Sequence, residues 1–109
     1  LFPIGVVADI LGVSNRILRN YEKQNIIRPS RSSTNRRLYS RNDIQKIEYI
    51  HYLNTIRKVN LAGIKEIFSL LDKLKDEKRD ELLSEVEREI KNLSGEKKKI
   101  LSGDAEAVK

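Results

Sequence analysis

The sequence contains no cysteine, methionine or tryptophan, and only two prolines occur among its 109 residues. Without cysteine the chain can form neither a disulfide framework nor a thiolate metal site. It also lacks any apolar run close to the roughly 20 residues that a membrane-spanning helix needs, and its first residues, LFPIG, lack the layout of a signal peptide. We therefore expect a soluble, cytoplasmic protein with no membrane partner.

Groups suited to catalysis are equally scarce. His51 is the only histidine, and the sequence fixes no acid or nucleophile beside it, which indicates a structural role. The carboxylates of the second half of the chain alternate with lysine and arginine at helical spacings, as on a solvated helix. We predict a protein that is not an enzyme and that has no catalytic residues, metal or cofactor.

Positive charge, by contrast, is abundant and gathered at one end. Residues 1–41 hold eight lysines and arginines against two acids, Asp9 and Glu22, whereas residues 42–109 hold fourteen of each sign. The whole net charge of +6 therefore originates in the first segment. Seven arginines lie within residues 16–41. Such an asymmetry predicts a polyanionic partner, and arginines beside turn residues favour a surface that contacts phosphates.

The first segment is typical of a helix-turn-helix. Gly5 is a tolerable N-cap for a short helix with Val7, Ile10 and Leu11 on one side, and Gly12 ends it. Ser14 can then cap a second helix from Asn15 to about Gln24.

The second helix has an apolar face of Ile17, Leu18 and Tyr21, and its other side chains are polar. Two short helices joined by a three-residue turn with glycine match the motif. On its exposed face, arginine can bond guanine and asparagine can bond adenine, although either can bind phosphates instead.

A basic hairpin follows. After the short β-like patch Ile26-Ile27, the polar residues 32–35 supply a loop tip, and Arg31, Arg36, Arg37 and Tyr39 flank it on two short strands. A hairpin of this kind beside a helix-turn-helix is a wing. The alternative is a solvated loop.

Two further helices are expected. Ser40 and Asp43 have the form of a capping box opening a third helix, and Asn60 caps a fourth. Apolar residues at steps of three and four give both helices a core-facing stripe.

The last long stretch predicts a coiled coil. From about Lys75 it has neither proline nor glycine until Gly95, and its apolar residues recur with heptad spacing. The predicted dimerisation seam consists of Leu83, Val86, Ile90, Leu93 and Ile100. We expect this helix to pair with its copy in a homodimer, with packing on the globular part as the alternative. The predicted division is a head over residues 1–73, a dimerisation helix over 74–101 and a disordered tail over 102–109.

Taken together, these residues resemble the MerR family of bacterial transcription regulators. The resemblance covers Phe2 to Leu71 and rests on LR-x-YE at residues 18–22 and R-x-Y at residues 37–39, which occur together with matching spacing. Within the family the chain looks most like the nitrogen-metabolism repressors of the GlnR and TnrA kind and the heat-shock repressors of the HspR kind. Many members have glycine where Asn35 stands, and asparagine also tolerates a positive φ.

The resemblance implies a mainly α fold: a winged helix-turn-helix head with a small hairpin wing, a two-helix linker and a C-terminal coiled-coil helix. It also implies a repressor that binds an inverted-repeat operator as a homodimer, with the second helix in the major groove, the wing on the backbone, and a possible protein effector. The predicted contacts to double-stranded DNA are Ser14, Asn15, Arg16, Arg19, Asn20, Tyr21, Lys23, Arg28, Arg31, Arg36, Arg37 and Tyr39.

Two other functions fit parts of the sequence. One is a protein-interaction adaptor that uses the coiled coil, and the other is an excisionase-like architectural factor that bends DNA. An adaptor would not need arginines on both a helix and a wing, and excisionase-like heads generally lack the heptad helix.

Overall fold

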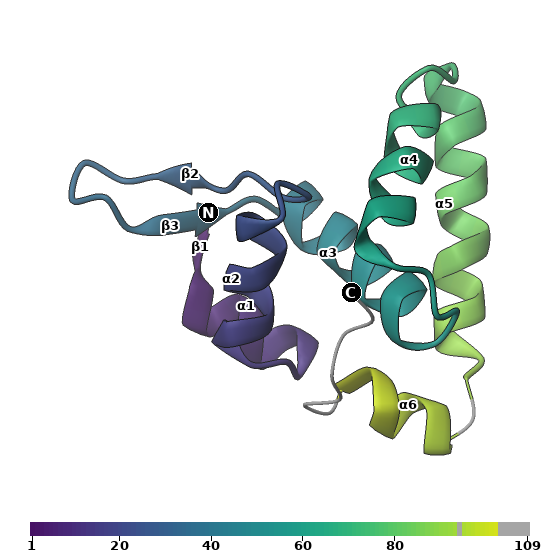
Figure 1. The fold of residues 1–109 in the computed structure, drawn as a ribbon, viewed down its shortest axis with the longest axis horizontal. Helices are drawn as coiled ribbons and strands as arrows, with labels where there is room; N and C mark the ends of the chain where they lie inside the picture. The colour runs from purple at the N-terminus through teal and green to yellow at the C-terminus, as the bar shows by residue number, and fades with distance from the viewer. Residues whose placement is uncertain (94, 103–109) are drawn as a thin grey trace.

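A computed structural model describes residues 1–93 and 95–102 of the chain. The hairpin projects from one end, α3 crosses the middle, and α4 and α5 both pack on α3 at the other end (Figure 1). The elements are β1 (Phe2–Pro3), α1 (Ile4–Leu11), α2 (Asn15–Lys23), β2 (Ser30–Arg31), β3 (Arg37–Tyr39), α3 (Arg41–Thr55), α4 (Leu61–Leu71), α5 (Asp76–Lys91) and α6 (Gly95–Ser102). The predicted mainly helical fold with a small hairpin is confirmed.

Three helices begin at the caps that the sequence predicts. The Ser14 hydroxyl accepts a hydrogen bond from the Ile17 amide at 3.3 Å. Ser40 and Asp43 form the reciprocal capping box, with bonds of 2.9 and 3.0 Å. The Asn60 side chain accepts from the Gly63 amide at 2.8 Å. These bonds satisfy amides that the first helical turn leaves without a partner.

The start of α1 differs from the prediction. This helix begins at Ile4 with Pro3 as its N-cap, and Gly5 lies inside its first turn. Proline presets the φ that an extended N-cap adopts, and Pro3 provides no side-chain capping hydrogen bond. Gly12 then ends α1 in the left-handed conformation, with φ of 68°. The three-residue turn to α2 is confirmed.

One core joins the four helices of the head. Val7, Leu18, Ile47 and Ile64, one from each helix, are fully buried in it. The linker contributes Ile26 and Ile27, which are also buried but form no strand, so the predicted β-like patch is wrong. Their apolar side chains pack into the core without a strand. Asn25, which follows α2, has a φ of 60° and turns the chain toward that core.

The sheet has a third strand, β1, that the sequence pattern does not predict. Its order is β1-β3-β2, and both pairings are antiparallel. Phe2 pairs with Tyr39, and Arg31 pairs with Arg37. The strand β1 therefore pairs with the edge of β3 that β2 does not occupy.

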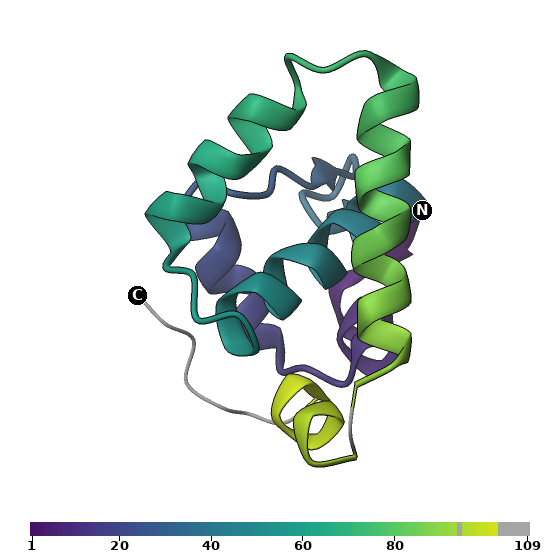
Figure 2. The same ribbon diagram turned by 90° about the vertical axis from the view of Figure 1, so that its right-hand side faces the viewer.

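The predicted continuous helix up to Ile100 is wrong. The helix α5 ends at Lys91, with Asn92 as its C-cap, and α6 starts only at Gly95 (Figure 2). Asparagine and glycine are poor helix formers, which explains the break. Leu93 thus lies between two helices and Ile100 lies on the second, so the predicted seam does not follow one helix.

The helix α5 packs back on α3 of the same chain. Tyr52 on α3 donates a hydrogen bond from its hydroxyl to Glu89 Oε2 at 2.8 Å. Leu83, Val86 and Ile90 are half-buried. The structure thus shows the intramolecular alternative for α5, while pairing between copies stays a prediction.

None of the helices within the described residues is long and apolar enough to cross a membrane. Most of the predicted tail, residues 103–109, lies outside the described part of the chain.

Candidate nucleic-acid interface

The outer face of α2 is basic. Its apolar residues Ile17 and Leu18 point into the core, whereas Arg16, Arg19 and Lys23 are exposed. Asn15 and Asn20 are half-exposed on the same helix, and the exposed Arg28 follows it. The hydroxyl of Ser14 is engaged in the cap. This helix therefore presents several donors for acceptor groups of a ligand and few acceptors.

The wing is an ordered hairpin with a basic tip. The Ser32 amide donates to the Arg36 carbonyl at 2.9 Å, and the Asn35 amide donates to the Ser32 carbonyl at 2.9 Å. The Arg36 amide also donates to the Ser32 hydroxyl at 3.0 Å. Asn35 has a φ of 63°, the conformation for which asparagine can replace glycine. The exposed side chain of Arg36 projects from this tip.

A single carboxylate joins α2 to the wing. Arg31 Nη2 on β2 lies 2.7 Å from Glu22 Oε1, and Arg37 Nε on β3 lies 2.8 Å from Glu22 Oε2. The sequence predicts no contact for Glu22. Its signals there are that it is one of two acids in the basic segment and that it ends the LR-x-YE motif of residues 18–22. Because the two arginines come from different strands, Glu22 fixes the whole hairpin relative to α2.

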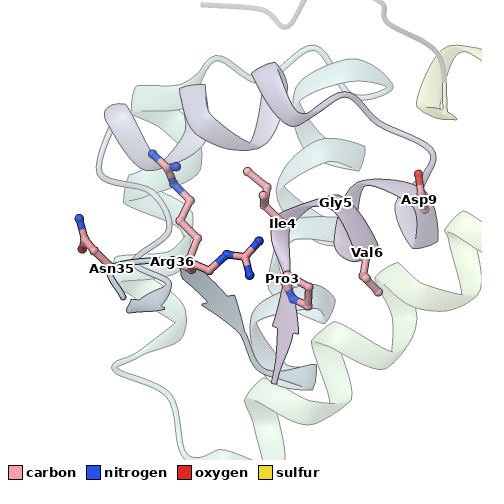
Figure 3. Close-up of a pocket in the computed structure, with 8 residues that line it drawn as sticks. Pro3, Ile4, Gly5, Val6, Asp9, Asn35 and Arg36 are labelled. Carbon is pink, nitrogen blue, oxygen red and sulfur yellow. The ribbon is translucent and has the colours of Figure 1, made fainter. Parts of the chain in front are cut away.

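A shallow pocket separates the wing from the start of α1. Pro3, Ile4 and Gly5 line one side, and Asn35 and Arg36 line the other, with Asp9 at the far end of α1 (Figure 3). The pocket has neither an enclosed shape nor converging acids. Among the described residues, no three histidine, aspartate or glutamate side chains come together to hold a metal ion.

Tyr21 lies on the buried side of α2, not at the interface. Its side chain is 0% exposed, and its hydroxyl oxygen lies 2.7 Å from His51 Nδ1 on α3, in a hydrogen bond. Burial raises the pKa of Tyr21 well above its usual value. The prediction that Tyr21 contacts DNA is therefore wrong, because its ring belongs to the core. The structural role expected of His51 agrees with this contact.

Tyr39 is also buried. Its side chain is 0% exposed, and within the described part of the chain its hydroxyl has no hydrogen-bond partner. Burial raises the pKa of Tyr39, and the charge of Glu22 raises it further, while Arg37 and Arg31 lower it. The predicted phosphate contact through Tyr39 is therefore corrected: the alternation along β3 turns this ring inward and Leu38 the other way.

We expect the replacement Tyr39→Phe to raise the free energy of unfolding by about 1 kcal/mol, because it removes a buried hydroxyl that lacks a partner. DNA affinity should not change. Urea unfolding and DNA titration of the variant measure both quantities. The matched control is Tyr21→Phe, which makes the same chemical change but removes the bond to His51 and should destabilise. Weaker DNA binding by Tyr39→Phe would indicate that the Tyr39 hydroxyl contacts a phosphate.

The arrangement of α1, α2 and the hairpin defines a winged helix-turn-helix domain with a basic face. The model of MerR HTH family regulatory proteins matches residues 2–71. The chain belongs to this family.

Curated relatives agree with this assignment. The chain is 45% identical over 67 residues to the HTH-type transcriptional regulator GlnR of Bacillus anthracis, covering 62% of this chain and 51% of that protein. It is 33% identical over 70 residues to the heat shock protein HspR of Streptomyces coelicolor, covering 64% and 46%. With the HTH-type transcriptional regulator TnrA of Bacillus subtilis it shares 38% over 47 residues, 43% of each. The chain spans about half the length of the curated relatives it matches.

Proposed function

We propose that this chain is the DNA-binding part of a transcriptional repressor that binds an inverted-repeat operator as a homodimer. The observation that carries the proposal is that basic side chains are exposed on α2 and on the wing, two elements that Glu22 joins. Two of the similar proteins are named as transcriptional regulators, which supports a role in regulation. A location in the cytoplasm, where such a protein meets DNA, is part of the proposal.

In this proposal α2 lies in the major groove, which admits one helix. Arg16 and Arg19 then reach guanine edges or phosphates, and Asn20 reaches adenine. The wing follows the adjoining backbone, where arginine pairs well with phosphate oxygens. The proposed contacts are Ser14, Asn15, Arg16, Arg19, Asn20, Lys23, Arg28, Arg31, Arg36 and Arg37.

The proposed homodimer uses the stripe of Leu83, Val86 and Ile90 on α5. These side chains are half-buried in a single chain, so pairing with a second copy would bury more apolar surface. Leu93 and Ile100 would add contacts from beyond α5. Two symmetric heads need an inverted repeat, with half-sites about 34 Å apart or a multiple of that spacing. Linking two heads also makes the second contact intramolecular and so raises the affinity.

Selection of bound duplexes from a random pool tests the proposal. We expect the pool to converge on an inverted repeat, and sedimentation of the selected duplex with the chain should show two protein copies. Convergence on a lone half-site with one bound copy would contradict the homodimer. A failure of any duplex to be enriched would contradict sequence-specific DNA binding.

A further inference from the structure

Among the described residues, the carboxylate of Glu22 is the one point where the wing is bonded to α2 through paired charges. Its two oxygens serve different strands, Oε1 for Arg31 and Oε2 for Arg37. Arg31 Nη1 also donates to the Asn35 carbonyl at 3.4 Å, so this side chain connects Glu22 to the tip of the wing. A paired carboxylate that reaches both strands controls the direction in which the hairpin leaves the domain.

The same carboxylate lowers the positive charge of the face. Glu22 and Asp9 are the only acids within residues 1–41, and they differ in their surroundings. The hydrogen bond from Arg37 to Glu22 raises the pKa of the Arg37 guanidinium. Asp9 is exposed and forms no ion pair with any other described residue. The two acids thus contribute equal charge, but only Glu22 is bonded to the wing.

We propose that Glu22 is a positioning residue that sets DNA specificity. Its ion pairs hold the wing at the angle to α2 that a cognate operator requires, and they keep Arg31 and Arg37 from binding the phosphates of unrelated DNA. This inference rests on the proposed function, since it concerns operator binding. It assigns Glu22 no contact with a base.

The two effects of removing the carboxylate have opposite signs. On unrelated DNA, freed arginines can reach phosphates without a required register, so affinity rises with the added net charge. On the operator, α2 and the wing must fit together, and a wing that has lost its fixed direction must be ordered during binding. A Glu22 variant should therefore gain affinity for unrelated DNA and lose discrimination.

The test compares Glu22→Gln with Asp9→Asn in the full chain, because each replaces one carboxylate by an amide of the same size. On unrelated DNA, Glu22→Gln should steepen the dependence of log affinity on log salt by about 0.9 for each phosphate that a freed arginine contacts, whereas Asp9→Asn frees no arginine and should change the slope less. Only Glu22→Gln should lower the ratio of operator to unrelated affinity, by roughly three- to tenfold. Melting curves verify that both variants are folded.

A second measurement reports the positioning without DNA. In the wild type and in Asp9→Asn, the Arg37 Nε proton should exchange slowly in ¹⁵N-edited NMR spectra, because it is donated to Glu22, and in Glu22→Gln it should exchange faster. Fast exchange in the wild type would overturn the proposed geometry.

Equal specificity ratios for the two variants would overturn the proposal while leaving DNA binding intact. A wild type that prefers no operator at all would instead overturn the proposed function, and the role of Glu22 with it.

Discussion

The affinity of this chain for duplex DNA is expected to fall about 10³- to 10⁵-fold between roughly 50 and 200 mM salt, as for a protein that neutralises six to ten phosphates. In the proposed homodimer, the exposed side chains of Arg16, Arg19, Lys23, Arg28 and Arg36 of both copies supply the charge. Most of the acids lie beyond residue 41, so few carboxylates compete with the phosphates. Each neutralised phosphate releases counterions, and salt opposes that release. Titration of a labelled operator at several salt concentrations gives the slope.

Single arginine replacements locate the face responsible for this dependence. Arg19→Ala should lower the slope by about 0.9 for each bound copy, because each copy loses one phosphate contact. Arg88→Ala removes the same charge from an exposed position on α5, away from the wing, and should leave the slope unchanged (Figure 1). An equal loss in both variants would mean that charge acts without regard to position. Binding that hardly responds to salt would contradict the electrostatic basis of the interface.

Replacing Tyr21 by alanine is expected to lower the free energy of unfolding by about 3 to 5 kcal/mol. The ring is fully buried between α2 and α3, and its hydroxyl bonds to His51 at 2.7 Å. Small domains are stable by only about 5 to 15 kcal/mol, so the variant would lose a large part of its stability. Chemical denaturation followed by circular dichroism measures the change.

Two milder variants separate packing from hydrogen bonding. Tyr21→Phe keeps the ring and should cost about 1 to 3 kcal/mol through the lost bond to His51. Lys23→Ala lies on the exposed side of the same helix and should change stability by less than about 0.5 kcal/mol. Tyr21→Phe at low temperature should still bind DNA. If Tyr21→Ala kept its stability but lost its DNA affinity, Tyr21 would belong to the interface.

Local signals in the sequence predicted much of the head. A serine or asparagine cap needs only the amides of the next turn, so Ser14, Ser40 and Asn60 could be assigned without knowledge of the fold. The apolar helix faces are likewise local properties. The basic face of α2 followed from the same reasoning, because residues opposite an apolar stripe are exposed.

Features that depend on distant partners were not predictable in the same way. Tyr39 was expected at the surface because it follows basic residues, but the pairing of β3 with β1 and β2 turns its ring inward. The docking of α5 depends on Tyr52 and Glu89, which are 37 residues apart. The role of Glu22 requires three elements to meet. Periodicity indicates which side of an element is apolar, but it does not identify the surface that covers it.

The junction between β3 and α3 couples the base of the wing to the start of α3. Tyr39 ends the strand, Ser40 caps the helix, and Arg41 begins it, so no flexible loop separates the two elements. The two hydrogen bonds of the capping box stabilise this junction. We therefore expect a rotation of α3 to move the base of the hairpin, while the ion pairs of Glu22 set the direction of the wing relative to α2. Because Tyr52 on α3 bonds to Glu89 on α5, we expect a displacement of α5 to reach the base of the wing through α3.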